Sequence, residues 1–354
     1  MHPYEDQPPR AFWARTIAKD DMPFEGIWQP KFPLGRHARI AMFGSCFAQH
    51  FKSALARRGL NWVNAEPAPE GLSDANVARF NYHVFSARTG TIYTAAMLHQ
   101  WCRWALTDEP APDEVWAHNG RFFDPMRPSI EPDGFETEAE LLASRAATIA
   151  AFARAVTEAD IFVFTLGLTE AWVNAVKGFE YAICPGVVAG RFHPACHDFV
   201  NHRFGAVTGD LEAAIGLMRG ANPRLNVLLT VSPVPLTATA TKRHVLVATT
   251  QSKAVLRAAA GDVADRHGFV DYFPSYEIVT SGATASAFYE ANRRTVSAHG
   301  VDTVMATLFE MMGVQPIGRA PQAPPTMAPP KTQAAPAADP ACLEELLAAF
   351  GRGV

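Results

Sequence analysis

Short apolar runs alternate with longer amphipathic segments along most of this 354-residue chain. The clearest runs, Ile161–Leu166 and Asn226–Val231, contain no charged residue, and helical periodicity of apolar residues follows each of them later in the chain. Strands that are apolar throughout are typical of parallel sheets, because helices cover both faces of such sheets. The alternation therefore predicts an α/β protein in which a parallel sheet lies between helices.

The same pattern places individual strands and helices along the chain. Thr137 is suited to cap the clearest helix, because Glu140 stands three residues later as in a capping box. Parallel sheets bind ligands at the carboxyl ends of their strands, so we expect functional residues directly after these runs. The strands are expected at 39–43, 60–64, 161–166, 226–231 and 268–272, and the helices at 47–59, 93–106, 136–157, 209–220, 243–266 and 296–312.

Four regions of different composition divide the chain. We expect residues 1–37 to form an irregular arm that wraps the domain, or alternatively a loose tail. Residues 38–314 are expected to form the globular α/β domain. Residues 315–340 are a Pro/Ala-rich segment with too little apolar bulk to fold, which predicts a disordered linker. The tail at 341–354 predicts one short helix over 341–350 that docks on a protein partner or on its own domain, or else stays disordered. The aromatic anchors expected in the arm are Phe12, Trp13, Phe24 and Trp28.

Composition limits the possible partners. The net charge of −4 gives no basic surface of the kind that nucleic acids bind. No apolar run approaches the length of a membrane helix, and the N-terminus lacks a signal peptide, so we expect a cytoplasmic protein that does not bind membranes. The five cysteines are scattered without metal-ligand spacing, and no glycine pattern typical of nucleotide binding occurs, so no metal and no cofactor are expected.

The segment from Phe43 to Ala48 carries the strongest chemical signal. Gly44 stands where a strand turns into a helix, and Ser45 and Cys46 follow at the helix N-terminus. Unpaired N–H groups and the helix dipole stabilise an anion there, and both side chains are able nucleophiles. The structural alternative is that Ser45 only caps the helix and Cys46 is a small core residue.

The string Gly44-Ser45-Cys46-Phe47-Ala48 resembles the signature of the GSCFA family. Further blocks in the same order resemble that family over residues 38–312. The resemblance implies the SGNH/GDSL hydrolase superfamily, hence a three-layer α/β/α sandwich with a mostly parallel, flavodoxin-like sheet and chemistry on ester or acyl groups. The later blocks are Asn81–Gly90, Ile92–Thr94, Asp124–Pro128, Phe164–Trp172, Thr230–Pro235 and Tyr272–Glu277.

The resemblance also suggests site residues. In the superfamily's Gly-Asp-Ser block Cys46 falls at the nucleophile position, whereas a shift of one residue places Ser45 there. Gly167-Leu168-Thr169-Glu170 is similar in form to the Gly-x-Asn-Asp block, and Thr169 would supply an oxyanion donor; the alternative for Thr169-Glu170 is a helix cap. The second superfamily block supplies an oxyanion donor, which the resemblance places near Asn81 and His83. Arg88 stands in the same segment and would bind a carboxylate or phosphate of the substrate, or alternatively form a structural ion pair.

The last superfamily block, Asp-x-x-His, is absent. Asn292-Arg293-Arg294-Thr295 stands in its place, and His299 lies further along at the start of a helix. A serine nucleophile needs a base within hydrogen-bond reach, so we expect His244 to serve as the substitute, with His83 as second choice. Arg243 or Lys253 would instead bind an anionic group, or else be solvated surface residues.

Two functions follow from these residues. The first is an SGNH-type esterase or acyltransferase that acts on an acyl, for example acetyl, ester of a small molecule, sugar or polysaccharide. The second is an inactive relative that binds a glycan or acyl group and recruits a protein partner through residues 341–350. Reaction with an acyl ester or a fluorophosphonate probe separates the two.

Overall fold

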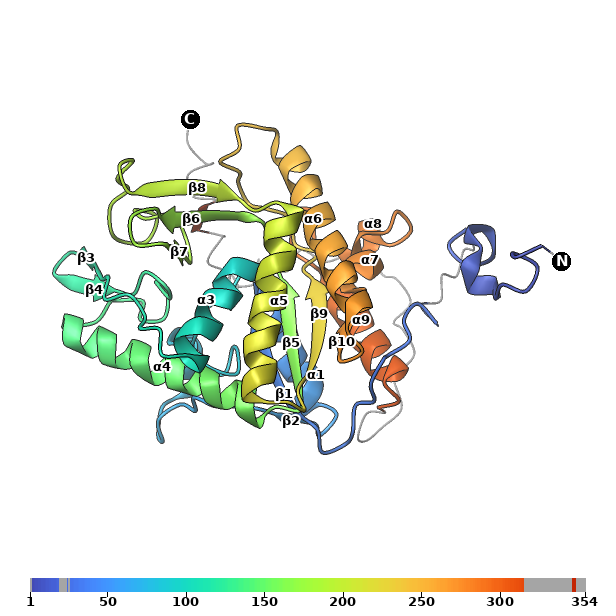
Figure 1. Ribbon diagram of the computed structural model, residues 1–354, viewed down its shortest axis with the longest axis horizontal. Coiled ribbons are helices and arrows are strands. Elements are labelled where there is room, and N and C mark those ends of the chain that lie inside the picture. Colours follow the sequence, from blue (N-terminus) through green and yellow to red (C-terminus); the bar gives the residue numbers. More distant parts are fainter. Residues whose placement is uncertain (1, 19–23, 25, 315–345, 348–354) are drawn as a thin grey trace.

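A computed structural model describes residues 2–18, 24, 26–314 and 346–347. Its centre is a five-stranded parallel sheet in the order β10-β9-β5-β1-β2 (Figure 1). Counted along the chain, these parallel strands lie in the order 2-1-3-4-5, which is the flavodoxin-like order. The order reverses between β1 and β5, and ligands bind at such a switch point. The strands are β1 Arg39–Gly44, β2 Asn61–Trp62, β5 Ile161–Leu166, β9 Asn226–Val231 and β10 Val270–Tyr272.

Two separate hydrophobic cores lie on the two faces of this sheet. In β1, Ala41 and Phe43 belong to one core, and Ile40 and Met42 belong to the other. Every residue of β5 is buried, which explains its unbroken apolar sequence. Side chains alternate between the faces of a strand, so a strand covered on both faces must be apolar at every position. The expected three-layer α/β/α sandwich is therefore confirmed.

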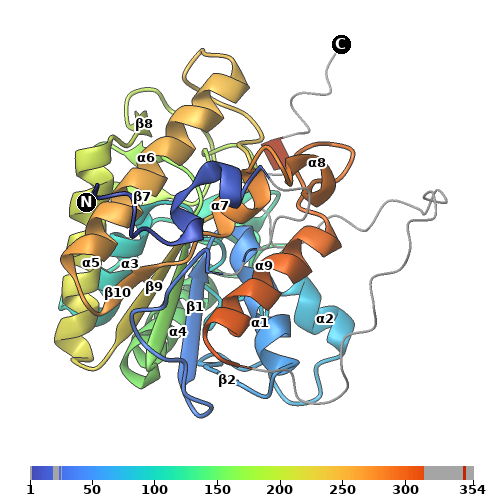
Figure 2. The ribbon, with the colours of Figure 1, turned by 90° about the vertical axis from the view of Figure 1, so that its right-hand side faces the viewer.

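Helices α3 to α6 cover one face, and α1, α7 and α9 cover the other (Figures 1 and 2). The N-caps of α3 and α4 are Thr94 and Thr137, whose hydroxyls accept hydrogen bonds from Met97 N and Glu140 N. The helices are α1 Gln49–Ala56, α2 Asp74–Arg79, α3 Ala95–Leu106, α4 Glu138–Glu158, α5 Phe204–Ala221, α6 Val245–Arg266, α7 Ser275–Thr280, α8 Ala285–Phe288 and α9 Ala298–Met311; short 3-10 turns occur at η1 Pro9–Ala11, η2 Trp13–Arg15 and η3 Cys46–Ala48.

A second, antiparallel sheet follows β5 and was not expected from the sequence. It has the order β7-β6-β8 and stands over the carboxyl end of the central sheet (Figure 1). The alternative of a helix cap at Thr169-Glu170 is wrong, because Glu170 begins strand β6. The additional strands are β6 Glu170–Asn174, β7 Phe179–Tyr181, β8 His197–Asn201 and the hairpin pair β3 Trp116–His118 and β4 Arg121–Phe123.

The N-terminal region contacts the domain through some of its aromatic residues. Trp28 is buried, and its ring packs edge-on against Phe273 at 5.1 Å between centroids. Phe24 packs against the same core, whereas Trp13 is 73% exposed. The expected linker at 315–340, and all of the expected helix at 341–350 except residues 346 and 347, lie outside the described residues.

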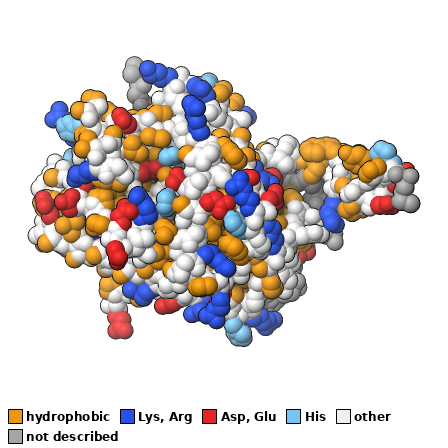
Figure 3. All heavy atoms as spheres, viewed as in Figure 1, with side chains coloured by type: hydrophobic (Ala, Val, Ile, Leu, Met, Phe, Trp, Pro, Cys, Tyr) orange, Lys and Arg blue, Asp and Glu red, His pale blue; other side chains and the backbone are white. Residues whose placement is uncertain are grey.

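Charged side chains of both signs are interspersed on the face that carries α5 and α6 (Figure 3). No helix among the described residues is long and apolar enough to cross a membrane.

Candidate functional site

The turn after β1 depends on Gly44. Its φ is +128°, and a Cβ placed on it would overlap the carbonyl of Thr165 on β5 and lie 2.6 Å from that residue's nitrogen. Gly44 pairs with Thr165 in the sheet, and Ser45 N donates to Thr165 O at 2.9 Å. Only glycine adopts this backbone conformation readily, so Gly44 fixes Ser45 against the end of β5.

Gly44→Ala is therefore expected to lower the free energy of unfolding by about 2–3 kcal/mol, because strain at this φ and overlap with backbone atoms act together. Urea unfolding measures the loss. Gly209→Ala is the matched control, because Gly209 is an exposed helical glycine with nothing within 4 Å of a built Cβ. That control is expected to be neutral or slightly stabilising. Equal effects of the two substitutions would contradict the role of Gly44.

Ser45 is the residue between strand and helix. It has extended backbone angles (φ −69°, ψ 167°) and is the N-cap of η3, yet its side chain makes no capping hydrogen bond. Only 2% of the residue is exposed, and Oγ has no hydrogen-bond partner within the described part of the chain. Cys46, the first residue of η3, is also buried at 8% exposure. The expected placement of both residues at a helix start holds, but neither is open to solvent.

Three side chains, those of Ser45, Tyr93 and Lys253, lie close to Gly167, which directly follows β5. A Cβ placed on Gly167 would lie 3.2 Å from Ser45 Cβ and 2.8 Å from the ring of Tyr93. Its carbonyl oxygen accepts a hydrogen bond of 2.5 Å from Nζ of Lys253, a lysine of α6 that is 2% exposed. The ends of β1 and β5 thus bring the first and third sequence blocks together, as their positions after neighbouring strands predict. The amine of Lys253 joins them from a distant helix.

Thr169, the oxyanion donor expected in this loop, already makes hydrogen bonds within the protein. Thr169 N donates to Oγ of Ser252, and Thr169 Oγ1 donates to Asn201 Oδ1 at 2.7 Å. Glu170 accepts hydrogen bonds from Thr239 Oγ1 and from Ala240 N, which ties the start of β6 to the loop after β9. These contacts hold the Gly167–Glu170 loop in place.

Residues of the second block mainly stabilise their own loop. Arg88 is buried and donates to Phe80 O, Ile130 O and Glu131 Oε1, and its guanidinium stacks on the ring of Tyr82. Asn81 has a positive φ, and its Nδ2 donates to Ser129 O. We find both side chains committed to joining the 80–90 segment to the 129–131 segment.

His83 lies near the amino end of the sheet. Its ring packs edge-on against Trp62, which pairs with Ile40 at the start of β1. Burial and then the charge of Lys52 hold the pKa of His83 below its ordinary value. Ile40 and Gly44 are four residue steps apart in β1, about 13 Å at 3.3 Å per residue. No hydrogen bond joins His83 to Ser45 Oγ, which has no partner in the described part of the chain.

His244 is exposed and caps α6, where its Nδ1 accepts a hydrogen bond from Leu246 N. Ser252 of the same helix touches Thr169, and eight residues of helix separate it from His244, about 12 Å along the axis. No hydrogen bond joins His244 to Ser45 Oγ, which has no partner among the described residues. In this structure His244 caps the N-terminus of α6.

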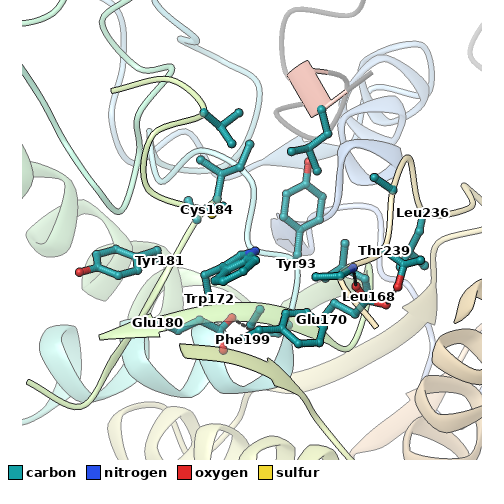
Figure 4. Close-up of a pocket in the computed structure, with 18 of the residues that line it drawn as sticks. Tyr93, Leu168, Glu170, Trp172, Glu180, Tyr181, Cys184, Phe199, Leu236 and Thr239 are labelled. Atoms are coloured by element: carbon teal, nitrogen blue, oxygen red, sulfur yellow. Dashed lines mark hydrogen bonds between the residues drawn. The ribbon is translucent and has the colours of Figure 1, made fainter. Parts of the chain in front are cut away.

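An apolar pocket of about 300 Å³ opens at the carboxyl end of the sheet (Figure 4). It lies next to the place where Gly167 approaches Ser45. Tyr93 belongs to both places, because it lines the pocket and its ring lies against Gly167. The volume is at the lower end of the range of small-molecule sites. Strands β6, β7 and β8 form much of its wall through Trp172, Tyr181 and Phe199. Further apolar lining residues include Met97, Leu168, Ile183, Val187, Leu236 and Leu347.

Glu180 is the buried carboxylate of this pocket. Its side chain accepts hydrogen bonds from Thr94 Oγ1 and from Nε2 of His202, the latter at 2.9 Å. Burial alone would lower the pKa of His202, but the hydrogen bond and charge of Glu180 raise it above its ordinary value. No Lys or Arg occurs among the described lining residues, so the pocket favours uncharged apolar groups over anions.

Comparison with known proteins assigns the chain to a protein family. The profile of the GSCFA family matches residues 39–308. The chain belongs to the GSCFA family. No curated protein sequence matches it significantly.

Solved structures with partial similarity to this GSCFA protein include a carbohydrate esterase family 3 protein from Talaromyces cellulolyticus, with a TM-score of 0.37 and 10% identity over 78% of this chain and 98% of the other. An acetyl esterase mutant with acetate ion has a TM-score of 0.34 and 11% identity over 78% of this chain and 98% of its own. A putative platelet activating factor from Streptococcus pneumonia has a TM-score of 0.28 and 13% identity, covering 49% of this chain and 67% of its own.

The place of the missing Asp-x-x-His block in this GSCFA protein is an exposed loop. Asn292 Nδ2 donates to Thr295 Oγ1 at 2.9 Å, and Asn292 Oδ1 accepts from the backbone of Arg294 and Thr295. The two residues that replace the acid and the base therefore bond to each other. His299 packs edge-on against Phe288.

Of the residues that line the pocket, the sequence singled out Glu170 as a site residue but not Tyr93. It assigned Lys253 to anion binding or to a solvated surface, whereas the structure buries this lysine at 2% exposure. Tyr93 lies within the family block Ile92–Thr94, and this position was the sequence feature that could have identified it as a site residue. In the described ranges, no group of three or more His, Cys, Asp and Glu side chains could hold a metal ion.

Proposed function

We propose that this GSCFA protein transfers or hydrolyses the acyl group of an ester, with Ser45 as nucleophile. The observation that carries the proposal is the Ser45 hydroxyl, which is buried and lacks a hydrogen-bond partner in the described structure at the switch point of the sheet. A buried polar group left unpaired costs about 1–3 kcal/mol. Such groups in native structures often have a catalytic role, and ligands bind at this edge of the sheet.

Lys253 is the base in this proposal. Ser45 and Lys253 both stand next to Gly167: Lys253 Nζ donates to Gly167 O, and Ser45 Cβ lies 3.2 Å from the place that a Cβ on Gly167 would take. Burial favours the neutral form of an amine, and serine nucleophiles paired with a lysine base are a known variant of the serine–histidine arrangement. Catalytic hydrogen bonds are often long before substrate binds, so a shift of the flexible lysine stem or one bridging water would complete the pair.

The reaction then proceeds through an acyl-serine. Ser45 Oγ bonds to the acyl carbon while its proton passes to the neutral Lys253 amine. The ester C–O bond breaks, and the resulting ammonium group returns the proton to the leaving alcohol. Water or an acceptor alcohol next attacks the acyl-serine, again through Lys253, and restores the Ser45 hydroxyl. N–H groups at the start of η3 stabilise the oxyanion, because the first N–H groups of a helix have no partner within it.

The apolar pocket supports an acyl group as the bound part of the substrate. Tyr93 separates the pocket from Gly167, so a chain in the pocket can present its carbonyl end toward Ser45 when this ring turns aside. Because most of the lining is apolar, we expect medium-length acyl esters to be better substrates than acetyl esters.

Lys253→Met is expected to lower the turnover of p-nitrophenyl butyrate by about 10²–10⁴-fold, the usual contribution of a general base. Methionine keeps the apolar stem and removes the amine. Lys177→Met, at a partly exposed lysine of the β6–β7 turn, is the control and should keep the wild-type rate. Turnover at the wild-type rate in Lys253→Met would exclude the base role.

A second function is favoured by the loop that replaces Asp-x-x-His. Asn292 and Thr295 bond to each other, and Ser45 is only 2% exposed. A protein that binds an acyl group without turnover fits these two observations. It would bind an apolar ester in the pocket and show no turnover in any variant.

A further inference from the structure

We propose that the apolar pocket is the docking site of this chain's own C-terminal segment, residues 341–350, which enters it through Leu347. Leu347 lines the pocket together with Tyr93 and Leu236, and it is half-buried against the main hydrophobic core. Its neighbour Leu346 is 45% exposed. The short C-terminal piece lies over the pocket above Tyr93 (Figure 4).

The sequence of this segment suits an apolar pocket. Leu343, Leu347 and Phe350 recur at i, i+4 and i+7, which is the spacing of one apolar helix face. The pocket walls are supplied by β6, β7 and β8, and their described residues include no Lys or Arg. An apolar side chain is therefore the group that this lining accepts best.

The intervening chain is long enough for the segment to reach the pocket. Helix α9 ends on the opposite face of the sheet from α3 and α5, and residues 315–345 connect it to Leu346. Such a stretch spans up to roughly 100 Å when extended, about twice the diameter of a domain of this size. A covalent connection of this length keeps the segment at an effective concentration on the order of millimolar, so weak contacts are sufficient for docking.

Docking would regulate the proposed reaction, and this consequence rests on the proposed function. Tyr93 lines the pocket and lies next to Gly167, and Leu347 forms part of the pocket wall, so docking of the segment narrows the space for an acyl chain. The segment and an acyl substrate are then competitors. Release of the segment opens the site without any change in the central sheet.

The test compares Leu347→Asp with Leu346→Asp in the full chain, using the uncharged fluorophore N-phenyl-1-naphthylamine as probe. Leu347→Asp should bind the probe about tenfold more tightly or better than wild type, because one buried leucine contact is lost. Leu346→Asp should behave as wild type. A synthetic peptide of residues 341–354 should displace the probe from Leu347→Asp.

Both variants are also made in a Ser45→Ala background, so probe binding is measured whether or not the protein has esterase activity. Equal probe affinity in wild type and both variants would overturn the docking proposal, as would failure of the peptide to compete. Probe affinity of the wild type that falls as protein concentration rises would show the segment of another copy in the pocket, and would overturn docking within one chain. Absence of ester turnover, with the expected probe binding, would overturn the proposed function alone.

Discussion

Ser45→Ala should reduce kcat/KM for an acyl ester by at least about 10⁴-fold, because removal of a serine nucleophile abolishes the covalent step. The loss should appear in kcat, since the apolar pocket that binds the acyl chain is untouched. Initial rates with p-nitrophenyl butyrate measure it, and thermal unfolding checks that the variant is folded. Ser45 Oγ makes no hydrogen bond to other described residues, so its removal should not destabilise the protein.

Cys46→Ala is the matched control at the adjacent position. Cys46 is the first residue of η3 and is buried, so its thiol is expected to contribute packing and not chemistry. The control should keep kcat/KM within about tenfold of wild type, because only a small buried side chain is trimmed. Loss of turnover in Cys46→Ala with retention in Ser45→Ala would assign the nucleophile to the thiol instead.

Asp124→Asn should lower the free energy of unfolding by about 3–5 kcal/mol, the usual cost of breaking a buried ion pair. Asp124 is 1% exposed and accepts hydrogen bonds from Arg127 Nε at 2.8 Å and from two nitrogens of Arg145, one of them at 2.9 Å. The substitution leaves two buried guanidinium groups without their anion. Denaturant unfolding at pH 7 measures the change.

The same carboxylate should make stability depend on pH. Burial alone would raise the pKa of Asp124, but Arg127 and Arg145 hold it below its ordinary value. A depressed folded-state pKa means that the contribution is present above the unfolded value of about 3.9 and is lost as pH falls through the folded value. Asp124→Asn should therefore flatten the acid limb of the stability curve.

Asp133→Asn provides the control for this prediction. Asp133 pairs with Arg79 at the surface with its side chain 69% exposed, so its removal should cost less than about 1 kcal/mol. Equal losses at both positions, or an unchanged acid limb in Asp124→Asn, would contradict the stabilising role of the buried cluster.

The central strands could be predicted because burial on both faces leaves a clear mark in sequence. Strands β5 and β9 begin and end where their apolar runs do, whereas β2 is shorter than the expected 60–64 and α5 begins at Phe204, before the expected 209. The antiparallel strands β6 to β8 were missed. Several of their residues are only half-buried and the strands are short, so local pattern does not distinguish them from loops.

The candidate site could be predicted only in part, for the same physical reason. Gly44, Ser45 and Gly167 follow strands that neighbour each other, so the parallel sheet brings them to one edge. The contact of Lys253 with Gly167 depends on how α6 packs, which no local pattern records. His244 caps the N-terminus of the same helix. The rise of about 1.5 Å per residue places it roughly 12 Å along the helix axis from Ser252, which contacts the Gly167–Glu170 loop.

The DPMRP block shows how a family motif can have a structural role. Residues Asp124 and Arg127 come from this block, and their buried ion pair with Arg145 joins it to α4. In sequence the block resembles a functional motif, because each of its two charged residues is followed closely by a proline. In the structure its charges bind one another inside the protein.

Labelling with a fluorophosphonate, followed by peptide mapping of the adduct, tests most directly whether Ser45 is an activated nucleophile. We expect the wild-type protein, with Leu347→Asp as the more accessible form, to gain one phosphonyl group on Ser45, and Lys253→Met to react far more slowly. A full-length protein that binds the apolar fluorophore yet gains no adduct at Ser45 in either form would contradict the catalytic proposal.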